Sequence, residues 1–265
     1  MASLFRVLAA KPYTSVLRRS FAVLAAKPTN EGLDATPSSS SNDATSFETL
    51  RGVIDNNTLK AIKHTHMSPV QARIFPLLPD LAFPYNQDTP LSKDNPKDLL
   101  VKAKTGTGKT MGFLIPAIEA RLKAIDAHLE SSALNAGIQL NPRLKAKAIS
   151  SYATERVGTL IVSPTRELAT QIAVEAANLT RHHLGFQIRI LLGGESKNRQ
   201  IREWCGRKDI VVCTPGRILD LLETRPEFAE ALKYTQMVSL LFSFFFGVPL
   251  SFDIYKFIIS ELAYS

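Results

Sequence analysis

The residues that most constrain this chain are Ala103-Lys-Thr-Gly-Thr-Gly-Lys109-Thr110, which follow the apolar run Leu99-Leu100-Val101. Glycines at positions 106 and 108 let successive backbone N–H groups turn toward one point, and Lys109 brings a cation to the same place. A helical pattern starts directly afterwards and aims its positive end there. A strand before the glycines and a helix after them predict a phosphate-binding loop, with the Thr110 hydroxyl as a ligand for Mg²⁺.

Three later strands each end in a short polar signature. The strands are Thr159–Ser163, Gln187–Leu192 and Asp209–Cys213, and the signatures that follow them are Pro164–Ala169, Gly193-Gly194 and Thr214–Arg217. Apolar strands that alternate with amphipathic helices predict a parallel sheet covered on both faces. Ligands of such sheets bind beyond the carboxyl ends of the strands, where all three signatures fall. Their hydroxyls, arginines and bare glycine backbone suit the phosphates of a sugar-phosphate chain.

In order and spacing, these motifs resemble those of the first RecA-like domain of the DEAD-box RNA helicases, a family of superfamily 2. The resemblance covers about residues 47 to 237. It includes Met67–Gln71 as the Q motif, Ala103–Thr110 as motif I, Pro164–Ala169 as motif Ia, Gly193-Gly194 as the GG doublet and Thr214–Arg217 as motif Ib. It implies an α/β fold, a RecA-like P-loop three-layer sandwich with a parallel sheet that is incomplete at its C-terminal end. It also implies RNA unwinding driven by ATP hydrolysis in the complete family member.

The resemblance implies two sets of ligand-binding residues. In the first set Gln71 reads the adenine edge, Phe47 is the isolated upstream aromatic, and His64 replaces the ring that usually packs on adenine, which weakens that contact. The ATP-binding set is Phe47, His64, Gln71, Lys104, Thr105, Gly106, Thr107, Gly108, Lys109 and Thr110, with Mg²⁺ on Thr110. The set implied to contact RNA is Pro164, Thr165, Arg166, Glu167, Gly193, Gly194, Thr214, Pro215, Gly216 and Arg217. These residues would hold the RNA backbone without reading its bases.

The family pattern stops near Val238. There the family has a strand that ends in Asp-Glu-Ala-Asp, whose carboxylates hold Mg²⁺ and position the attacking water. This chain continues with Ser239-Leu-Leu-Phe-Ser-Phe-Phe-Phe, and it contains neither an Asp-Glu dipeptide nor the Ser-Ala-Thr triplet of motif III. No catalytic residue is therefore assigned. The rival hypothesis is a non-catalytic fragment that binds nucleotide and RNA. Another P-loop NTPase, such as a GTPase, is disfavoured by Gln71 and by Thr214–Arg217.

Residues 238 to 265 differ in composition from the rest of the chain. They hold six of the fourteen phenylalanines and only three charged side chains, Asp253, Lys256 and Glu261. One hypothesis is that this divergent tail translates a retained intron or an out-of-frame stretch, and the other is a membrane anchor. The apolar part, Met237–Phe252, has 16 residues, whereas a spanning helix needs about 20. We therefore expect no stable membrane span.

The N-terminal end is basic. Residues 1 to 30 contain no acidic side chain and carry Arg6, Lys11, Arg18, Arg19 and Lys27. That profile is typical of a mitochondrial transit peptide and predicts a matrix protein; the alternative is a disordered RNA-binding arm in a cytoplasmic or nuclear protein. Residues 31 to 46 form a polar linker that we expect not to fold, so the ordered domain should span residues 47 to 237.

Four further groups of residues carry weaker signals. Ala124–Val157 is expected to be a helical insertion with breaks at Asn135-Ala-Gly and Asn141-Pro. A basic cluster forms either a groove that tracks phosphates or a solvated helix face, and its members are Lys197, Arg199, Arg202, Arg207 and Lys208. His182-His183 is expected at a solvated helix C-terminus. Cys205 and Cys213 are expected to be packing residues.

Overall fold

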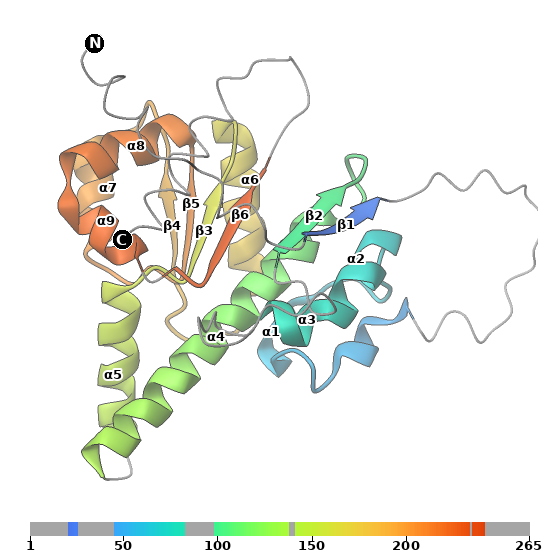
Figure 1. The fold of residues 1–265 in the computed structure, drawn as a ribbon, viewed down its shortest axis with the longest axis horizontal. Helices are drawn as coiled ribbons and strands as arrows, with labels where there is room; N and C mark the ends of the chain where they lie inside the picture. The colour runs from blue at the N-terminus through green and yellow to red at the C-terminus, as the bar shows by residue number, and fades with distance from the viewer. Residues whose placement is uncertain (1–20, 26–44, 83–97, 138–140, 234, 242–265) are drawn as a thin grey trace, which may run out of the picture.

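The computed structural model describes residues 21–25, 45–82, 98–137, 141–233 and 235–241. Most of the predicted transit segment, the predicted linker up to residue 44 and the tail after residue 241 lie outside these ranges. Figure 1 shows a twisted sheet with helices packed around it, and two consecutive helices that extend away from the body of the molecule.

Four parallel strands form the main sheet. They are β3 (Thr159–Val162), β4 (Ile188–Leu191), β5 (Ile210–Cys213) and β6 (Met237–Leu240), and their spatial order is β4-β5-β3-β6. The three apolar runs identified in the sequence are strands, as predicted. β6 reaches Leu240, so the first residues of the segment predicted as a divergent tail belong to the sheet.

A second pair of parallel strands consists of β1 (Phe21–Ala25) and β2 (Asp98–Lys102). β2 is the predicted strand that leads into the glycine-rich loop. β1 pairs with it along its whole length, from Phe21 opposite Asp98 to Ala25 opposite Lys102. Because β1 lies within the predicted transit segment, the structure contains a strand upstream of Phe47, where the ordered domain was expected to begin.

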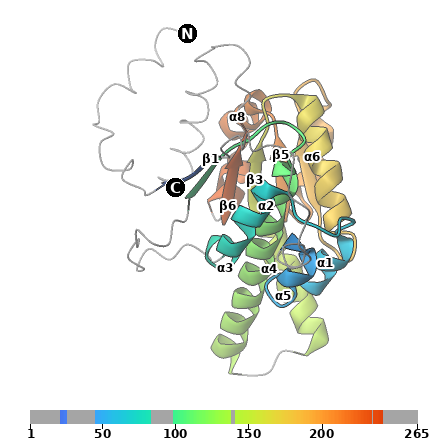
Figure 2. The same cartoon turned by 90° about the vertical axis from the view of Figure 1, so that its right-hand side faces the viewer.

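Helices cover both faces of the sheet, which confirms the predicted three-layer arrangement (Figure 2). The helices are α1 (Asn56–Ala61), α2 (Pro69–Ile74), α3 (Leu78–Leu81), α4 (Lys109–Ala136), α5 (Pro142–Glu155), α6 (Arg166–Leu179), α7 (Lys197–Trp204), α8 (Pro215–Thr224) and α9 (Pro226–Leu232). Two 3-10 turns, η3 (Phe47–Leu50) and η4 (Phe75–Leu77), belong to the segment before β2.

Alternate side chains of β3 and of β5 enter two separate apolar cores. Ile161 of β3 packs in the core that contains α4 and α6, whereas its neighbour Leu160 packs in the core of α7, α8 and α9. This is the period-two alternation of a strand, and burial on both faces explains why the strands are continuously apolar. Cys213 belongs to the second core, as predicted, but Cys205 is exposed and the prediction that it packs is wrong.

The predicted helical insertion is the hairpin of α4 and α5. α4 ends before Gly137, which has a left-handed backbone (φ 62°), and α5 begins after Asn141, whose side chain accepts the Leu144 N–H. Both breaks therefore fall where the sequence predicts them. At the base of the hairpin, the ring of Tyr152 on α5 stacks on the ring of His128 on α4, with 4.4 Å between the centroids.

Candidate functional site

The glycine-rich loop has the conformation that its sequence predicts. Gly106 and Gly108 have φ values of 76° and 75°, a left-handed region that other residues rarely adopt. Gly108 is the residue before α4, so the unpaired N–H groups of that helix start at the loop. Lys109 Nζ donates to the carbonyl oxygens of Ala103, at 2.8 Å, and of Lys104. Burial lowers the pKa of the Lys109 ammonium group.

The Q-motif residues lie directly on this loop. Gln71 Nε2 donates to the Gly108 carbonyl oxygen at 3.0 Å, and Ser68 Oγ donates to the Thr107 carbonyl oxygen at 2.8 Å. Gln71 Oε1 accepts the Ser68 N–H at 2.8 Å, which completes a capping box at the start of α2. Both ends of the Gln71 amide therefore have partners within the protein. A contact of Gln71 with adenine stays a prediction.

The other predicted ATP-binding residues divide into buried and accessible ones. Phe47 is only 3% exposed and packs against Phe75, with 5.9 Å between the ring centroids, so its observed role is packing in the core. The side chains or backbone of the remaining residues are accessible: His64, Lys104, Thr105 and Gly106 are exposed, and Thr107, Gly108, Lys109 and Thr110 are half-buried. Thr110, the first residue after the lysine, can offer its hydroxyl to a cation bound with phosphates.

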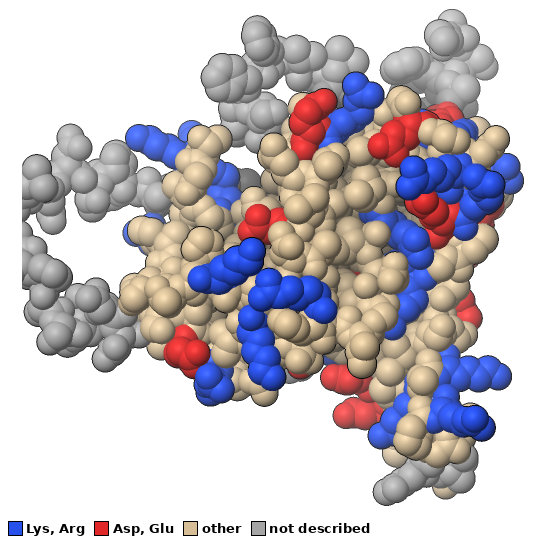
Figure 3. Space-filling model, turned by 180° about the vertical axis from the view of Figure 1, so that it is seen from behind, with Lys and Arg blue, Asp and Glu red and all other residues tan. Residues whose placement is uncertain are grey.

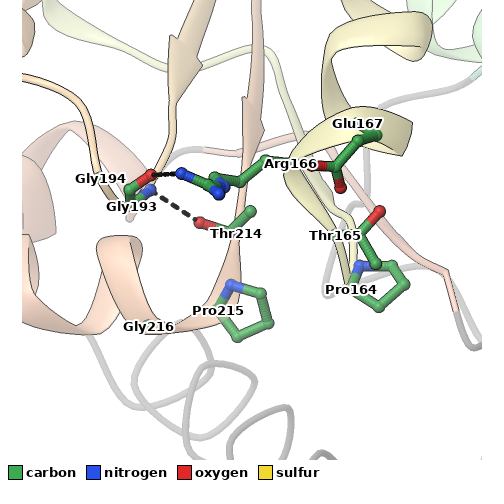
Figure 4. Close-up of a pocket in the computed structure, with 9 residues that line it drawn as sticks. All are labelled: Pro164, Thr165, Arg166, Glu167, Gly193, Gly194, Thr214, Pro215 and Gly216. Carbon is green, nitrogen blue, oxygen red and sulfur yellow. Dashed lines mark hydrogen bonds between the residues drawn. The ribbon is translucent and has the colours of Figure 1, made fainter.

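The three strand-end signatures meet at one edge of the sheet and line an open pocket of about 610 Å³ (Figure 4). The pocket contains nine of the ten residues predicted to contact RNA: Pro164, Thr165, Arg166, Glu167, Gly193, Gly194, Thr214, Pro215 and Gly216. Two helices begin at this edge, α6 after Thr165 and α8 after Thr214. Their N-termini direct free N–H groups and positive dipole ends to the pocket, which favours an anionic ligand.

Two hydrogen bonds link the three signatures to one another. Arg166 Nη1 donates to the Gly193 carbonyl oxygen at 3.4 Å, and the Gly193 N–H donates to Thr214 Oγ1 at 3.2 Å. Gly194 has φ 82°, and a Cβ at this position would lie 2.5 Å from Arg166 Nη1. The left-handed backbone favours glycine at this position, and a Cβ there would displace the guanidinium group of Arg166.

Arg217 lies outside the residues that line the pocket and binds Gln200 and Glu195. Its Nη1 donates to Gln200 Oε1 at 3.0 Å, and its Nη2 donates to the Glu195 carbonyl oxygen at 2.9 Å. Gln200 is buried and its Nε2 donates to the Leu192 carbonyl oxygen at 3.0 Å. The burial of Gln200 and its contact with Arg217 were not predicted from the sequence, because a glutamine on a strongly polar helix gives no sign of burial. In this structure Arg217 braces α7 against α8 and does not line the pocket.

Most of the basic cluster near α7 has partners within the protein. Lys197 pairs with Asp220 at 2.7 Å and Arg199 with Glu203 at 2.8 Å. Arg207 pairs with the buried Asp209 at 3.0 Å, and Lys208 lies over the Trp204 ring, where burial lowers its pKa to about 8. Figure 3 shows basic and acidic side chains interspersed at the upper right of the rear face. Most basic side chains of this cluster thus have partners within the protein. This disfavours the prediction that the cluster forms a groove that tracks phosphates.

The loop offers backbone N–H groups, the Lys109 ammonium group and the Thr110 hydroxyl. These groups suit phosphate oxygens better than they suit a complete metal site. β6 ends at Leu240, and the N–H of Leu241 donates to the Val162 carbonyl oxygen at 3.1 Å. Within the described ranges, no group of three or more His, Cys, Asp or Glu side chains is arranged to hold a metal ion. The hydroxyl of Thr110, beside the loop, stays a predicted Mg²⁺ ligand. No helix in the described part of the chain is long and apolar enough to span a membrane.

Comparison with known proteins identifies the same family. The family model for the DEAD/DEAH box helicase matches residues 83–240. DEAD-box ATP-dependent RNA helicase 48 of Oryza sativa subsp. japonica is 37% identical over 145 residues, which are 54% of this chain and 15% of that protein. ATP-dependent RNA helicase DDX18 of Homo sapiens is 34% identical over 188 residues, which are 69% of this chain and 22% of that protein.

Solved structures agree with the sequence relatives. The structure of the DEAD-box helicase Mss116 bound to ssRNA and UDP-BeF matches with a TM-score of 0.55 and 25% identity, over 82% of this chain and 37% of that chain. The yeast DEAD-box splicing factor Prp28 matches with a TM-score of 0.56 and 21% identity, which supports the fold alone. This chain spans less than a quarter of the length of the two sequence relatives. The region that the family model matches contains the loop, the three signatures and β6. Because this region is more than half of the chain, the chain belongs to the DEAD/DEAH box helicase family.

Proposed function

We propose that this chain binds ATP at the glycine-rich loop and RNA at the strand-end pocket, as the first RecA-like domain of an ATP-dependent RNA helicase. The observation that carries the proposal is the pocket itself, in which Arg166, Gly193 and Thr214 from three separate strand ends are hydrogen-bonded into one surface. The relative Mss116 is described as bound to ssRNA and UDP-BeF, which supports both ligand classes.

ATP binding would use the loop and the first turn of α4. The backbone N–H groups from Gly106 to Thr110 would cradle the phosphates, and Lys109 would exchange the carbonyl oxygens of Ala103 and Lys104 for phosphate oxygens. Thr110 would hold Mg²⁺, which neutralises charge on the β- and γ-phosphates. Gln71 would hold the loop through Gly108, and we propose that it also reads the adenine edge.

RNA binding would use phosphate contacts only. Arg166 is exposed at the pocket, and the N-termini of α6 and α8 add partial positive charge. Glycine backbone at positions 193, 194 and 216 lets a sugar-phosphate chain approach closely. These groups carry no information about base identity, so we propose binding without sequence preference.

The pocket assignment is tested by single-stranded RNA titration of the full chain. Arg166→Ala should weaken binding several-fold and reduce its salt dependence, because a phosphate contact is lost. The matched control is Arg143→Ala, which removes an exposed arginine near the start of α5, on the hairpin. Equal affinities for the wild-type chain and Arg166→Ala would contradict the assignment.

A second candidate function is binding without hydrolysis. The end of β6 supports it: the strand ends at Leu240 and the chain continues with Leu241-Phe-Ser-Phe, whereas the family resemblance implies Asp-Glu-Ala-Asp at the end of this strand. Hydrolysis needs Mg²⁺ and the attacking water to be held in place, and the carboxylates that the family uses for this are replaced in this sequence. Phosphate release with saturating RNA should therefore equal that of Lys109→Ala. RNA-stimulated turnover that Lys109→Ala abolishes would exclude this candidate.

We also propose that residues 1 to 30 direct the protein to the mitochondrial matrix. The supporting observation is the acid-free composition with five basic residues. A reporter fused to residues 1 to 45 should enter mitochondria, and replacement of Arg18 and Arg19 by Glu should prevent import. A wild-type reporter that stays in the cytosol would contradict the proposal.

A further inference from the structure

A polar cluster with three buried side chains and one half-buried side chain lies at the N-terminal end of α1. Its members are Asp55, Thr58, Glu119 and His183, called here the Glu119 junction. Glu119 Oε1 on α4 accepts the N–H of Asp55, the cap of α1, at 3.0 Å. Thr58 Oγ1 on α1 lies 2.9 Å from Nε2 of His183, which lies between α6 and β4. The same nitrogen lies 3.8 Å from Asp55 Oδ1.

The junction corrects the expectation for the histidine pair. His183 was expected at a solvated helix end, but its side chain is only 8% exposed and it contacts α1. The contact of His183 with Thr58 could not be predicted from a local pattern, because the two residues lie 125 positions apart in the chain. Burial lowers the pKa of His183, and the negative charge of Asp55 opposes that shift.

The junction joins the three parts that the proposed ligands use. α4 carries Lys109 at its start and Glu119 ten residues later, about 15 Å along one continuous helix. α1 belongs to the adenine-side segment, residues 45–82, which also contains Gln71. α6 starts at Arg166 in the pocket and ends shortly before His183. Figure 2 shows α1 beside the lower end of α6, and the two helices are in contact.

Besides the apolar packing of α2 and α3 on α4, polar contacts attach the adenine-side segment to that helix and the loop before it at two places. One attachment is at the loop, where Gln71 and Ser68 bind the carbonyl oxygens of Gly108 and Thr107. The other is Glu119, which holds the N-terminal end of α1. If the second attachment opens, the N-terminal end of α1 loses its hydrogen bond to α4, while the apolar packing of α2 and α3 on α4 remains.

We propose that Glu119 is a positioning residue for nucleotide binding, which holds the adenine-side segment on α4 so that Gln71 and Ser68 meet the phosphate loop. This inference rests on the proposed binding of ATP. Closing of the junction and binding of ATP support each other, because both need the same placement of the segment.

The chemistry of the junction makes this coupling depend on pH. Glu119 is only 4% exposed, and burial raises the pKa of its carboxyl group to about 7. The Asp55 N–H, the Thr58 hydroxyl and Lys123 on α4 oppose the shift, whereas the Asp55 carboxylate increases it. The other titratable groups facing the junction are His183, with its neighbour His182, and Asp126 on α4, whose pKa is also raised.

Protonation of Glu119 and closing of the junction are linked, so the opening equilibrium changes with pH. A carboxyl group with a pKa near 7 in the closed junction and near 4.5 in water binds its proton more tightly when the junction is closed. A rise in pH therefore favours opening of the junction. Each pH unit above 7 changes the balance by a factor of ten, so wild-type ATP affinity should fall by up to about tenfold between pH 6 and pH 8 from this group.

The test is ATP titration of the full chain at pH 6, 7 and 8, with wild type and Glu119→Gln compared at each pH. The glutamine is neutral and can still accept the Asp55 N–H, and the comparison cancels the titration of ATP itself. The affinity ratio of wild type to Glu119→Gln should fall by up to about tenfold from pH 6 to pH 8. Glu119→Ala loses the acceptor and should bind ATP more weakly at every pH.

Two controls make the outcome specific. Glu130→Gln removes an exposed carboxyl group from α4, about three turns further along and away from the junction, and should leave the pH profile unchanged. Lys109→Ala should abolish ATP binding. If wild type binds ATP through Lys109 but the ratio to Glu119→Gln is constant with pH, the role of Glu119 is disproved while the proposed function stands. If wild type binds no ATP, both are disproved.

Discussion

The side-chain amide of Gln71 donates a hydrogen bond to the backbone carbonyl oxygen of Gly108, at 3.0 Å. A Cβ at Gly108 would lie 2.4 Å from the donating nitrogen, so the two residues can meet only because position 108 is glycine. The Q motif and the phosphate loop, which are separate signatures in the sequence, are therefore one structural unit.

Substitution of Gly108 should damage this unit more than backbone strain alone can explain. Gly108→Ala places a Cβ in the left-handed region, which costs about 1–2 kcal/mol, and also displaces Gln71. Gly52→Ala is the matched control, since Gly52 has φ 83° and nothing within 4 Å of the added Cβ. Urea unfolding of the two variants measures the difference. Equal losses of stability would show that Gln71 imposes no requirement on position 108.

Substitution of Gly194 should weaken RNA binding without abolishing the fold. Gly194→Ala would bring a Cβ within 2.5 Å of Arg166 Nη1 and push the guanidinium group away from the pocket. Gly137→Ala is the matched control: Gly137 also has a left-handed backbone and nothing within 4 Å of an added Cβ, but it follows α4 on the hairpin, outside the pocket, so this variant should bind RNA as the wild type does. Filter-binding titration with single-stranded RNA compares them. A wild-type affinity for Gly194→Ala would rule out a role for the position of Arg166.

The buried ion pair of Arg121 and Asp209 should make a large contribution to stability. Both side chains are fully buried, with 2.9 Å between Arg121 Nε and Asp209 Oδ1. Asp209→Ala leaves the arginine buried without its counter-charge and should cost about 3–5 kcal/mol of unfolding free energy. Asp220→Ala breaks the partly exposed pair with Lys197 and should cost about 1 kcal/mol or less. Similar losses in urea unfolding would contradict this ranking.

Stability should fall as pH rises from 5 to 8 because of Glu119. Its pKa is about 7 in the folded chain and near 4.5 when exposed, so the folded state binds more protons between these values. Unfolding free energy then decreases with pH across this window, by up to ~3 kcal/mol from this group. Glu119→Gln should remove that contribution. Parallel pH profiles of unfolding free energy for wild type and Glu119→Gln would show that burial does not raise the pKa of the Glu119 carboxyl group.

The strand-end pocket could be predicted from the sequence because its signals are local. Each apolar run is followed directly by its signature, and parallel strands bring their carboxyl ends to one edge of the sheet. The breaks at Gly137 and Asn141 were predictable for the same reason, since glycine and asparagine terminate and start helices through their own backbone and side chain.

The remaining features depend on which residues meet in three dimensions. The positions of Glu119 and His183 in one junction follow from contacts between helices far apart in the chain, and no local pattern indicates them. Arg217 was assigned to RNA from its motif, but its observed partners are Gln200 and the Glu195 carbonyl. β1 lies in a basic segment whose composition is typical of a leader, so composition alone did not predict a strand there.

The most direct test of the account is equilibrium titration of the full chain with fluorescent ATP and GTP analogues. We predict saturable binding of the adenine nucleotide, weaker binding of the guanine nucleotide, and loss of both in Lys109→Ala, because the loop cation faces the phosphates. Unchanged ATP affinity in Lys109→Ala, or equal affinity for the two nucleotides, would contradict it.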